Sequence, residues 1–115
     1  MTTYTQKAKI NPGKTPAAKA KSPKWDFRLY VAGHTKKSID AFKNLSLICE
    51  EQLTGIYRIE VIDIWEHPQL ARTAQILAVP TLVRKHPLPV RNIIGDLSNK
   101  ERVLASLGII EYAFV

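Results

Sequence analysis

Apolar and polar residues alternate between Trp25 and Ala32, which predicts a β-strand over this range. After Gly33 the apolar residues recur every three or four positions, which predicts a helix from about Lys36 to Leu53. Thr35 is placed to cap the start of this helix, and Gly55 to cap its end. The apolar positions of the strand are Phe27, Leu29 and Val31, which alternate with Asp26, Arg28 and Tyr30. The apolar face of the helix comprises Ile39, Phe42, Leu45, Cys49 and Leu53.

The second half of the chain holds shorter elements. A strand is predicted from Tyr57 to Trp65, and Pro68 begins a short helix that extends to about Leu77. Two further strands, over 81–85 and 90–94, are joined by a connector short enough to require an antiparallel hairpin. Ser98 and Glu101 have the spacing of a capping box, which predicts a last helix. The long first helix favours a parallel crossover, so the order βαβαββα predicts an α/β, thioredoxin-like fold with a mixed sheet.

Charge is distributed unevenly along the 115 residues, which are enough for one domain. Residues 1–24 carry only basic charges, from Lys7, Lys9, Lys14, Lys19, Lys21 and Lys24. Residues 25–115 are nearly neutral, so the net charge of +7 belongs to a tail. We expect 1–24 to be a disordered basic tail that solubilises the chain or touches an acidic partner, RNA or a membrane surface. No apolar run is long enough to cross a membrane, and no membrane partner is expected for the folded part of the chain.

The thioredoxin-like order raises the question of thiol chemistry, because such catalysts carry a Cys-X-X-Cys pair at the start of the first helix. That place reads Ala32-Gly33-His34-Thr35-Lys36 and contains no sulfur. The only cysteine, Cys49, falls on the apolar helix face, which predicts a buried, inert thiol and fits a reducing cytoplasm.

Other chemistries find no support in the residue pattern. The histidines His34, His67 and His86 lack metal-ligand spacing, so we expect neither a metal nor a cofactor. Asp63 and Glu66 are predicted to mark a solvated strand end and helix start, and Trp25 and Trp65 to serve packing. The frame of a redox protein without its thiols therefore favours a non-enzymatic binding role.

Several short motifs, which follow one another along the chain, indicate the family that the sequence resembles. They are Leu29-Tyr30-Val31-Ala32-Gly33, Val61-Ile62-Asp63, Pro68-Gln69-Leu70-Ala71, Ile76-Leu77-Ala78, Pro80-Thr81-Leu82, Pro89-Val90-Arg91 and Ile93-Ile94-Gly95-Asp96-Leu97-Ser98, with Glu101, Val103 and Leu104. Together they resemble the KaiB circadian clock protein family over residues 25–110, leaving 111–115 as a C-terminal tail. The resemblance implies a regulator that binds a KaiC-type RecA-like ATPase or kinase, in circadian timing or in related stress or signalling control. It also implies two folds, a thioredoxin-like binding form and a tetrameric ground state of order βαββααβ.

The resemblance assigns roles to individual residues. Ser106 and Gly108 are the fold-switch candidates, whereas Pro80 is the candidate cis proline because thioredoxin-like folds carry one at that place. Ser106 and Gly108 stand where the resemblance implies a glycine and an aspartate that favour the tetramer, so we expect the thioredoxin-like form at rest. The partner-contact candidates are surface residues around the second strand, the second helix and the hairpin: Arg58, Glu60, Arg72, Arg84 and Arg91.

Some implied features stay open at this stage. Asp40, Glu60 and Gln75 stand where the resemblance implies positive charge. A role with a different KaiC-type ATPase, outside the standard clock, is therefore expected at least as much as a role in the clock itself. A partnership with KaiA is unsupported, and a homo-oligomer, either dimer or tetramer, stays open. The alternatives are a thioredoxin-like redox protein that lacks the Cys-X-X-Cys pair, or nucleic-acid binding through the basic tail, for which the nearly neutral domain gives little support.

Overall fold

The computed structural model describes residues 23–109. Their elements follow the predicted order βαβαββα, and not the alternative order βαββααβ. The strands are β1 (Trp25–Val31), β2 (Tyr57–Asp63), β3 (Thr81–His86) and β4 (Arg91–Ile94). The helices are α3 (Lys36–Gln52), α4 (Pro68–Thr73) and α5 (Lys100–Leu107). Apart from Pro23 and Lys24, the tails expected over 1–24 and 111–115 lie outside the described residues.

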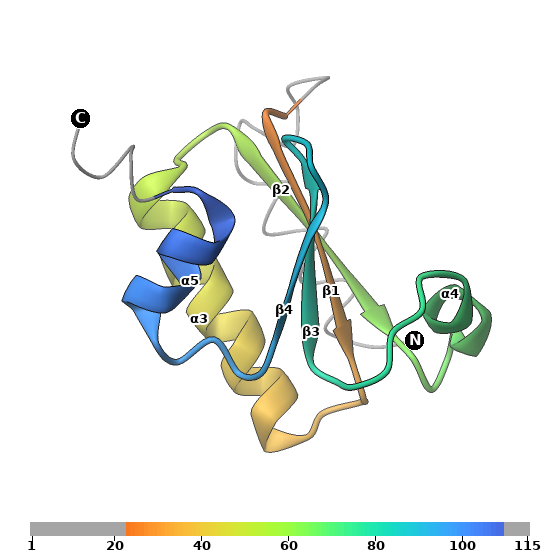
Figure 1. The fold of residues 1–115 in the computed structure, drawn as a ribbon. Coiled ribbons are helices and arrows are strands. Elements are labelled where there is room, and N and C mark those ends of the chain that lie inside the picture. Colours follow the sequence, from red (N-terminus) through yellow and green to blue (C-terminus); the bar gives the residue numbers. More distant parts are fainter. Residues whose placement is uncertain (1–22, 110–115) are drawn as a thin grey trace.

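The strands form one mixed sheet in the order β2-β1-β3-β4. β1 runs parallel to β2, with Leu29 opposite Val61, and antiparallel to β3, with Leu29 opposite Leu82. β3 and β4 form the predicted antiparallel hairpin. Helices α3 and α5 cover one face of the sheet, whereas α4 lies on the other side, near the ends of β1 and β2 (Figure 1).

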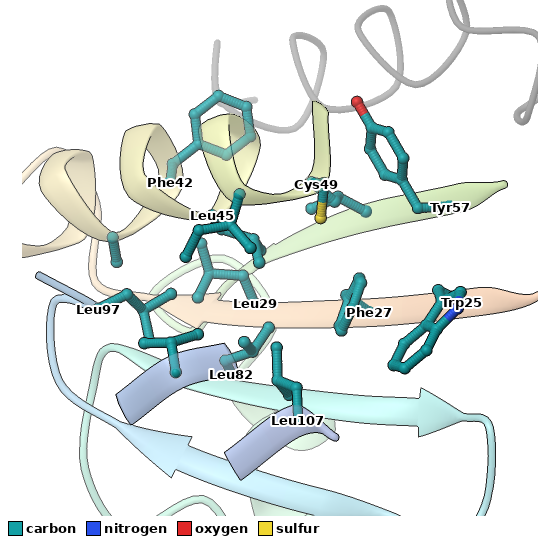
Figure 2. Packing of buried hydrophobic residues seen from close by; sticks show 14 of the residues in the cluster. Trp25, Phe27, Leu29, Phe42, Leu45, Cys49, Tyr57, Leu82, Leu97 and Leu107 are labelled. Carbon is teal, nitrogen blue, oxygen red and sulfur yellow. The ribbon is translucent and has the colours of Figure 1, made fainter. Parts of the chain in front are cut away.

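The hydrophobic core lies between the sheet and the helices α3 and α5 (Figure 2). Phe27, Leu29 and Leu82 reach it from the strands and Leu45 and Leu107 from the helices, each with no exposed surface. Burial of one such side chain contributes roughly 1.5–3 kcal/mol, so this layer supplies most of the drive for folding. The apolar face predicted for α3 therefore packs as its periodicity indicates.

The helix ends confirm some of the predicted signals and correct others. Thr35 caps α3, because its hydroxyl oxygen accepts the Ser38 N–H at 3.3 Å. The cap of α5 is Asn99 and not the predicted Ser98, because the Asn99 side chain accepts the Arg102 N–H at 3.1 Å. Likewise Leu53, and not Gly55, is the C-cap of α3.

Several element boundaries differ from prediction, and two polar residues of β1 are buried. Helix α4 ends at Thr73 and not near Leu77, and Gln75 takes a positive φ of 59° in the turn that follows. β2 stops at Asp63, and β4 begins at Arg91. On β1, Asp26 and Tyr30 alternate with the apolar residues, and both are buried as well. Long side chains on this strand and on β2 reach them, as described below.

Candidate partner-binding surface

The loop between β1 and α3 occupies the place where a thioredoxin-type catalyst carries its thiols. The carboxylate of Asp63 accepts hydrogen bonds from the Gly33 N–H at 3.1 Å and the Trp65 N–H at 2.9 Å. Asp63 is only 3% exposed, so the prediction of a solvated strand end is wrong. A buried carboxylate needs such partners, and here they fasten the loop at the end of β1 to the turn after β2.

Trp65 lies against this loop. A Cβ built on Gly33, whose φ is +58°, would come within 2.4 Å of the Trp65 ring. The backbone of Gly33 and the indole are therefore in direct contact. The remaining surface of Trp65 is open, with 68% of the residue exposed, whereas Trp25 is buried at 3%. The prediction that both tryptophans serve packing is thus correct for Trp25, and Trp65 packs against Gly33 while most of its surface stays exposed.

Cys49 is fully buried among the core residues, as predicted (Figure 2). Burial raises the pKa of its thiol well above the usual value, and the neighbouring Glu50 charge acts in the same direction. A protonated thiol inside the core is a poor nucleophile. The Val79–Pro80 peptide bond is cis, which confirms the prediction for Pro80.

Arg58 and Glu60 lie on β2 and each pairs with the residue opposite on β1. The Arg58 guanidinium donates to both carboxylate oxygens of Asp26, at 3.3 and 2.8 Å. Glu60 accepts from Arg28 at 3.1 Å. The side chains of Arg58 and Glu60 remain about half exposed, so each pair contributes roughly 0–1 kcal/mol and leaves charge at the surface.

Arg84 is not a surface residue, contrary to prediction. It is 5% exposed, and its guanidinium donates to the carbonyl oxygens of Leu107 and Pro89. The same group lies over the Trp25 ring, 5.7 Å from the ring centre. Burial, and secondarily the like charge of Arg91, lowers the pKa of Arg84. Arg84 therefore joins β3, the hairpin connector and the end of α5.

The other candidates are placed as follows. Arg72 is exposed in the last turn of α4, and Arg91 is exposed at the start of β4. Ser106 is half-buried on α5, and Gly108 ends that helix in the left-handed conformation with φ of +77°. The structure therefore brings Arg58 and Glu60 together on one strand, whereas Arg72 and Arg91 lie on separate elements.

Sequence reasoning missed the large exposed apolar residues. Apart from Trp65, these are Leu47, Leu70, Leu77, Leu88, Val90 and Ile94. For Leu88 and Val90 a signal existed, because the prolines at 87 and 89 keep the connector out of a regular strand.

Within residues 23–109, no set of at least three His, Cys, Asp or Glu side chains is grouped as a metal ion would require. None of the described helices is long and apolar enough to cross a membrane.

The fold and its loop define a thioredoxin-fold domain without the thiol pair. Solved structures agree on the fold. Chloroplastic thioredoxin z matches with a TM-score of 0.64 and 20% identity, over 83% of this chain and 86% of its own. The N-terminal domain of Synechococcus elongatus SasA matches with a TM-score of 0.62 and 21% identity, over 76% of this chain and 85% of its own.

The sequence comparisons are more specific. A family model described as the KaiB domain matches residues 28–109. The circadian clock oscillator proteins KaiB of Thermosynechococcus vestitus and Synechococcus elongatus are each 51% identical over 83 residues. These matches cover 72% of this chain and 77% and 81% of the two relatives. The chain belongs to the KaiB family, and its homologues support a clock-related regulator.

Proposed function

We propose that this protein is a non-enzymatic regulator that binds a KaiC-type RecA-like ATPase or kinase. The observation that carries the proposal is the KaiB domain match over 28–109 on a chain whose fold has no thiol in the loop before α3. The setting is circadian timing or a related stress or signalling pathway in the cytoplasm, where ATP is available. KaiA has no support as a partner.

The proposed contact surface contains the exposed candidates Arg58, Arg72 and Arg91 and the half-buried Glu60. Arg84 is left out because its guanidinium is occupied by carbonyl oxygens inside the fold. Arginine is often among the few residues that dominate an interface, and the solvated charges here are available to an acidic partner. Arg72 and Arg91 form no ion pair within residues 23–109, so they are the first to test.

The test is complex formation with a purified KaiC-type ATPase from the same organism, measured by size-exclusion chromatography with light scattering in ATP and in ADP. The same run gives the mass of the free protein. A complex formed from a free monomer or dimer supports a preformed thioredoxin-like binding state. A free tetramer that binds slowly would favour a fold-switching clock protein, against the expectation drawn from Ser106 and Gly108. No complex in either nucleotide refutes the proposal.

The interface is tested by charge reversal at both free arginines. R72E/R91E should weaken the complex by about tenfold or more, because two attractive charges become repulsive. K43E is the control, since Lys43 is exposed on α3 and outside the proposed surface. Equal binding by the double variant and the control would remove Arg72 and Arg91 from the interface.

A further inference from the structure

A groove of about 470 Å³ runs between β4 and α5. Its walls are formed by Asn92, Ile93 and Ile94 on the strand side and Arg102, Val103 and Ser106 on the helix side. The turn from Gly95 to Asn99 closes one end. The volume is within the usual range for pockets that take small molecules or short peptide segments.

β4 is an outer strand of the sheet, so its far side is unpaired by any strand within 23–109. The Gly95 N–H donates to the Pro80 carbonyl. Hydrogen-bonded pairs recur at every second residue of an antiparallel hairpin, so the main-chain groups of Gly95, Ile93 and Arg91 point toward β3. The main-chain groups of the residues between them, Asn92 and Ile94, therefore point to the open edge. A row of such groups is a template for an added strand.

Charge shows what kind of strand fits. Arg102 is exposed on the helix wall, and its guanidinium forms no ion pair in the described part of the chain. Arg91, equally free, stands at the other end of β4. The acidic residue in the lining, Asp96, accepts the Ser98 N–H at 3.0 Å. Hydrogen bonding to Ser98 is the main cause that lowers the pKa of Asp96, and the charge of Lys37 acts in the same direction. Arg102 in the wall of the groove, and Arg91 one residue before the lining residue Asn92, therefore offer two cations to an occupant.

The chain itself is a poor occupant. Residues 1–22 contain five lysines and no acid, so they would bring like charge to Arg91 and Arg102. β4 runs parallel to β1, and α5 covers the same face as α3 (Figure 1). A strand after α5 placed beyond β4 would then need a left-handed crossover, which occurs in only about 2% of cases. A second copy paired through β4 would set the same arginines against each other.

We propose that the groove between β4 and α5 binds an extended, acidic segment of a partner protein, which adds a strand to β4 and places a carboxylate at Arg102. Main-chain bonds to Asn92 and Ile94 supply affinity, and the arginines supply the preference for acid. Arg84 keeps the two walls at a fixed spacing, because it joins Pro89, just before β4, to Leu107, at the end of α5. This site shares Arg91 with the ATPase contact proposed above, whereas Arg102 and the edge of β4 belong to the groove alone.

The test uses two labelled heptapeptides in which valine and threonine alternate, one with two glutamates and the other with two lysines at the same positions. Fluorescence anisotropy at low salt should show about tenfold tighter binding of the acidic peptide. R102E should remove that preference, and K43E, an equal change of charge on α3, should keep it. In NMR spectra the amide signals of Asn92 and Ile94 should shift on binding.

Several results would overturn the proposal. These are absence of binding at millimolar peptide, equal affinity for the two peptides, identical behaviour of R102E and K43E, and unmoved amides of Asn92 and Ile94. Because the ATPase is absent from this assay, its failure leaves the proposed function untouched. Conversely, a failed ATPase complex does not affect the peptide result.

Discussion

Gly33→Ala tests the contact between the loop before α3 and Trp65. An alanine at the Gly33 φ of +58° carries a left-handed backbone penalty of roughly 1–2 kcal/mol. Its Cβ would also meet the indole at 2.4 Å, so the ring must move. About a third of Trp65 is covered, which corresponds to roughly 80 Å² and at most about 2 kcal/mol. With partial loss of that contact added to the backbone penalty, G33A should lower the free energy of unfolding by about 2–3 kcal/mol.

Gly55→Ala separates the two contributions. Gly55 has a φ of +80° and no heavy atom within 4 Å of its Cβ position, so G55A should cost the backbone penalty alone, about 1–2 kcal/mol. Urea unfolding of G33A, G55A, W65A and G33A/W65A gives the four free energies. In the W65A background, the cost of G33A should fall to that of G55A. If G33A costs the same with and without Trp65, the indole does not lie on Gly33 in solution and this account of the loop is wrong.

Three further predictions concern the interior. Arg84→Ala should lower the free energy of unfolding by about 2–4 kcal/mol, because it leaves the Leu107 and Pro89 carbonyls unpaired; a loss below about 1 kcal/mol in urea unfolding would contradict this. Cys49 should react with a thiol reagent only after denaturant is added, and rapid native labelling would disprove its burial. Burial, followed by the hydrogen bond to Glu50, raises the pKa of Tyr57, so stability should fall above about pH 10, where the unfolded tyrosine ionises. Tyr57→Phe should show a weaker alkaline slope.

The order of elements could be predicted from sequence because each signal is local and strong. The helical period from Ile39 to Leu53 and the hairpin connector at 86–89 both depend on neighbours within a few positions. The cap of α5 was misassigned because Ser98 and Asn99 are both good capping residues one position apart. Only the hydrogen bond to Arg102 distinguishes them.

The burial of charged residues was harder to predict because it depends on partners from distant parts of the chain. Asp26 and Tyr30 are buried because Arg58 binds Asp26 from β2 and Arg28 contacts the Tyr30 hydroxyl. Asp63 is likewise satisfied by a loop thirty residues away along the chain. None of these pairings has a signature in a local window.

Arg84 had a signal that sequence reasoning did not use. Residues at positions i and i+2 of a strand lie on the same face, so Arg84 shares the face of Leu82, which lies opposite Leu29 in the core. A cation at such a position requires acceptors, and the hairpin provides one because β4 begins only at Arg91 and leaves the Pro89 carbonyl free to accept. The C-terminus of α5 provides the other, where the helix dipole favours positive charge. The guanidinium therefore stabilises the junction of the hairpin and α5, and the cations that remain for partners are those outside it, on β2, α4, β4 and the exposed side of α5.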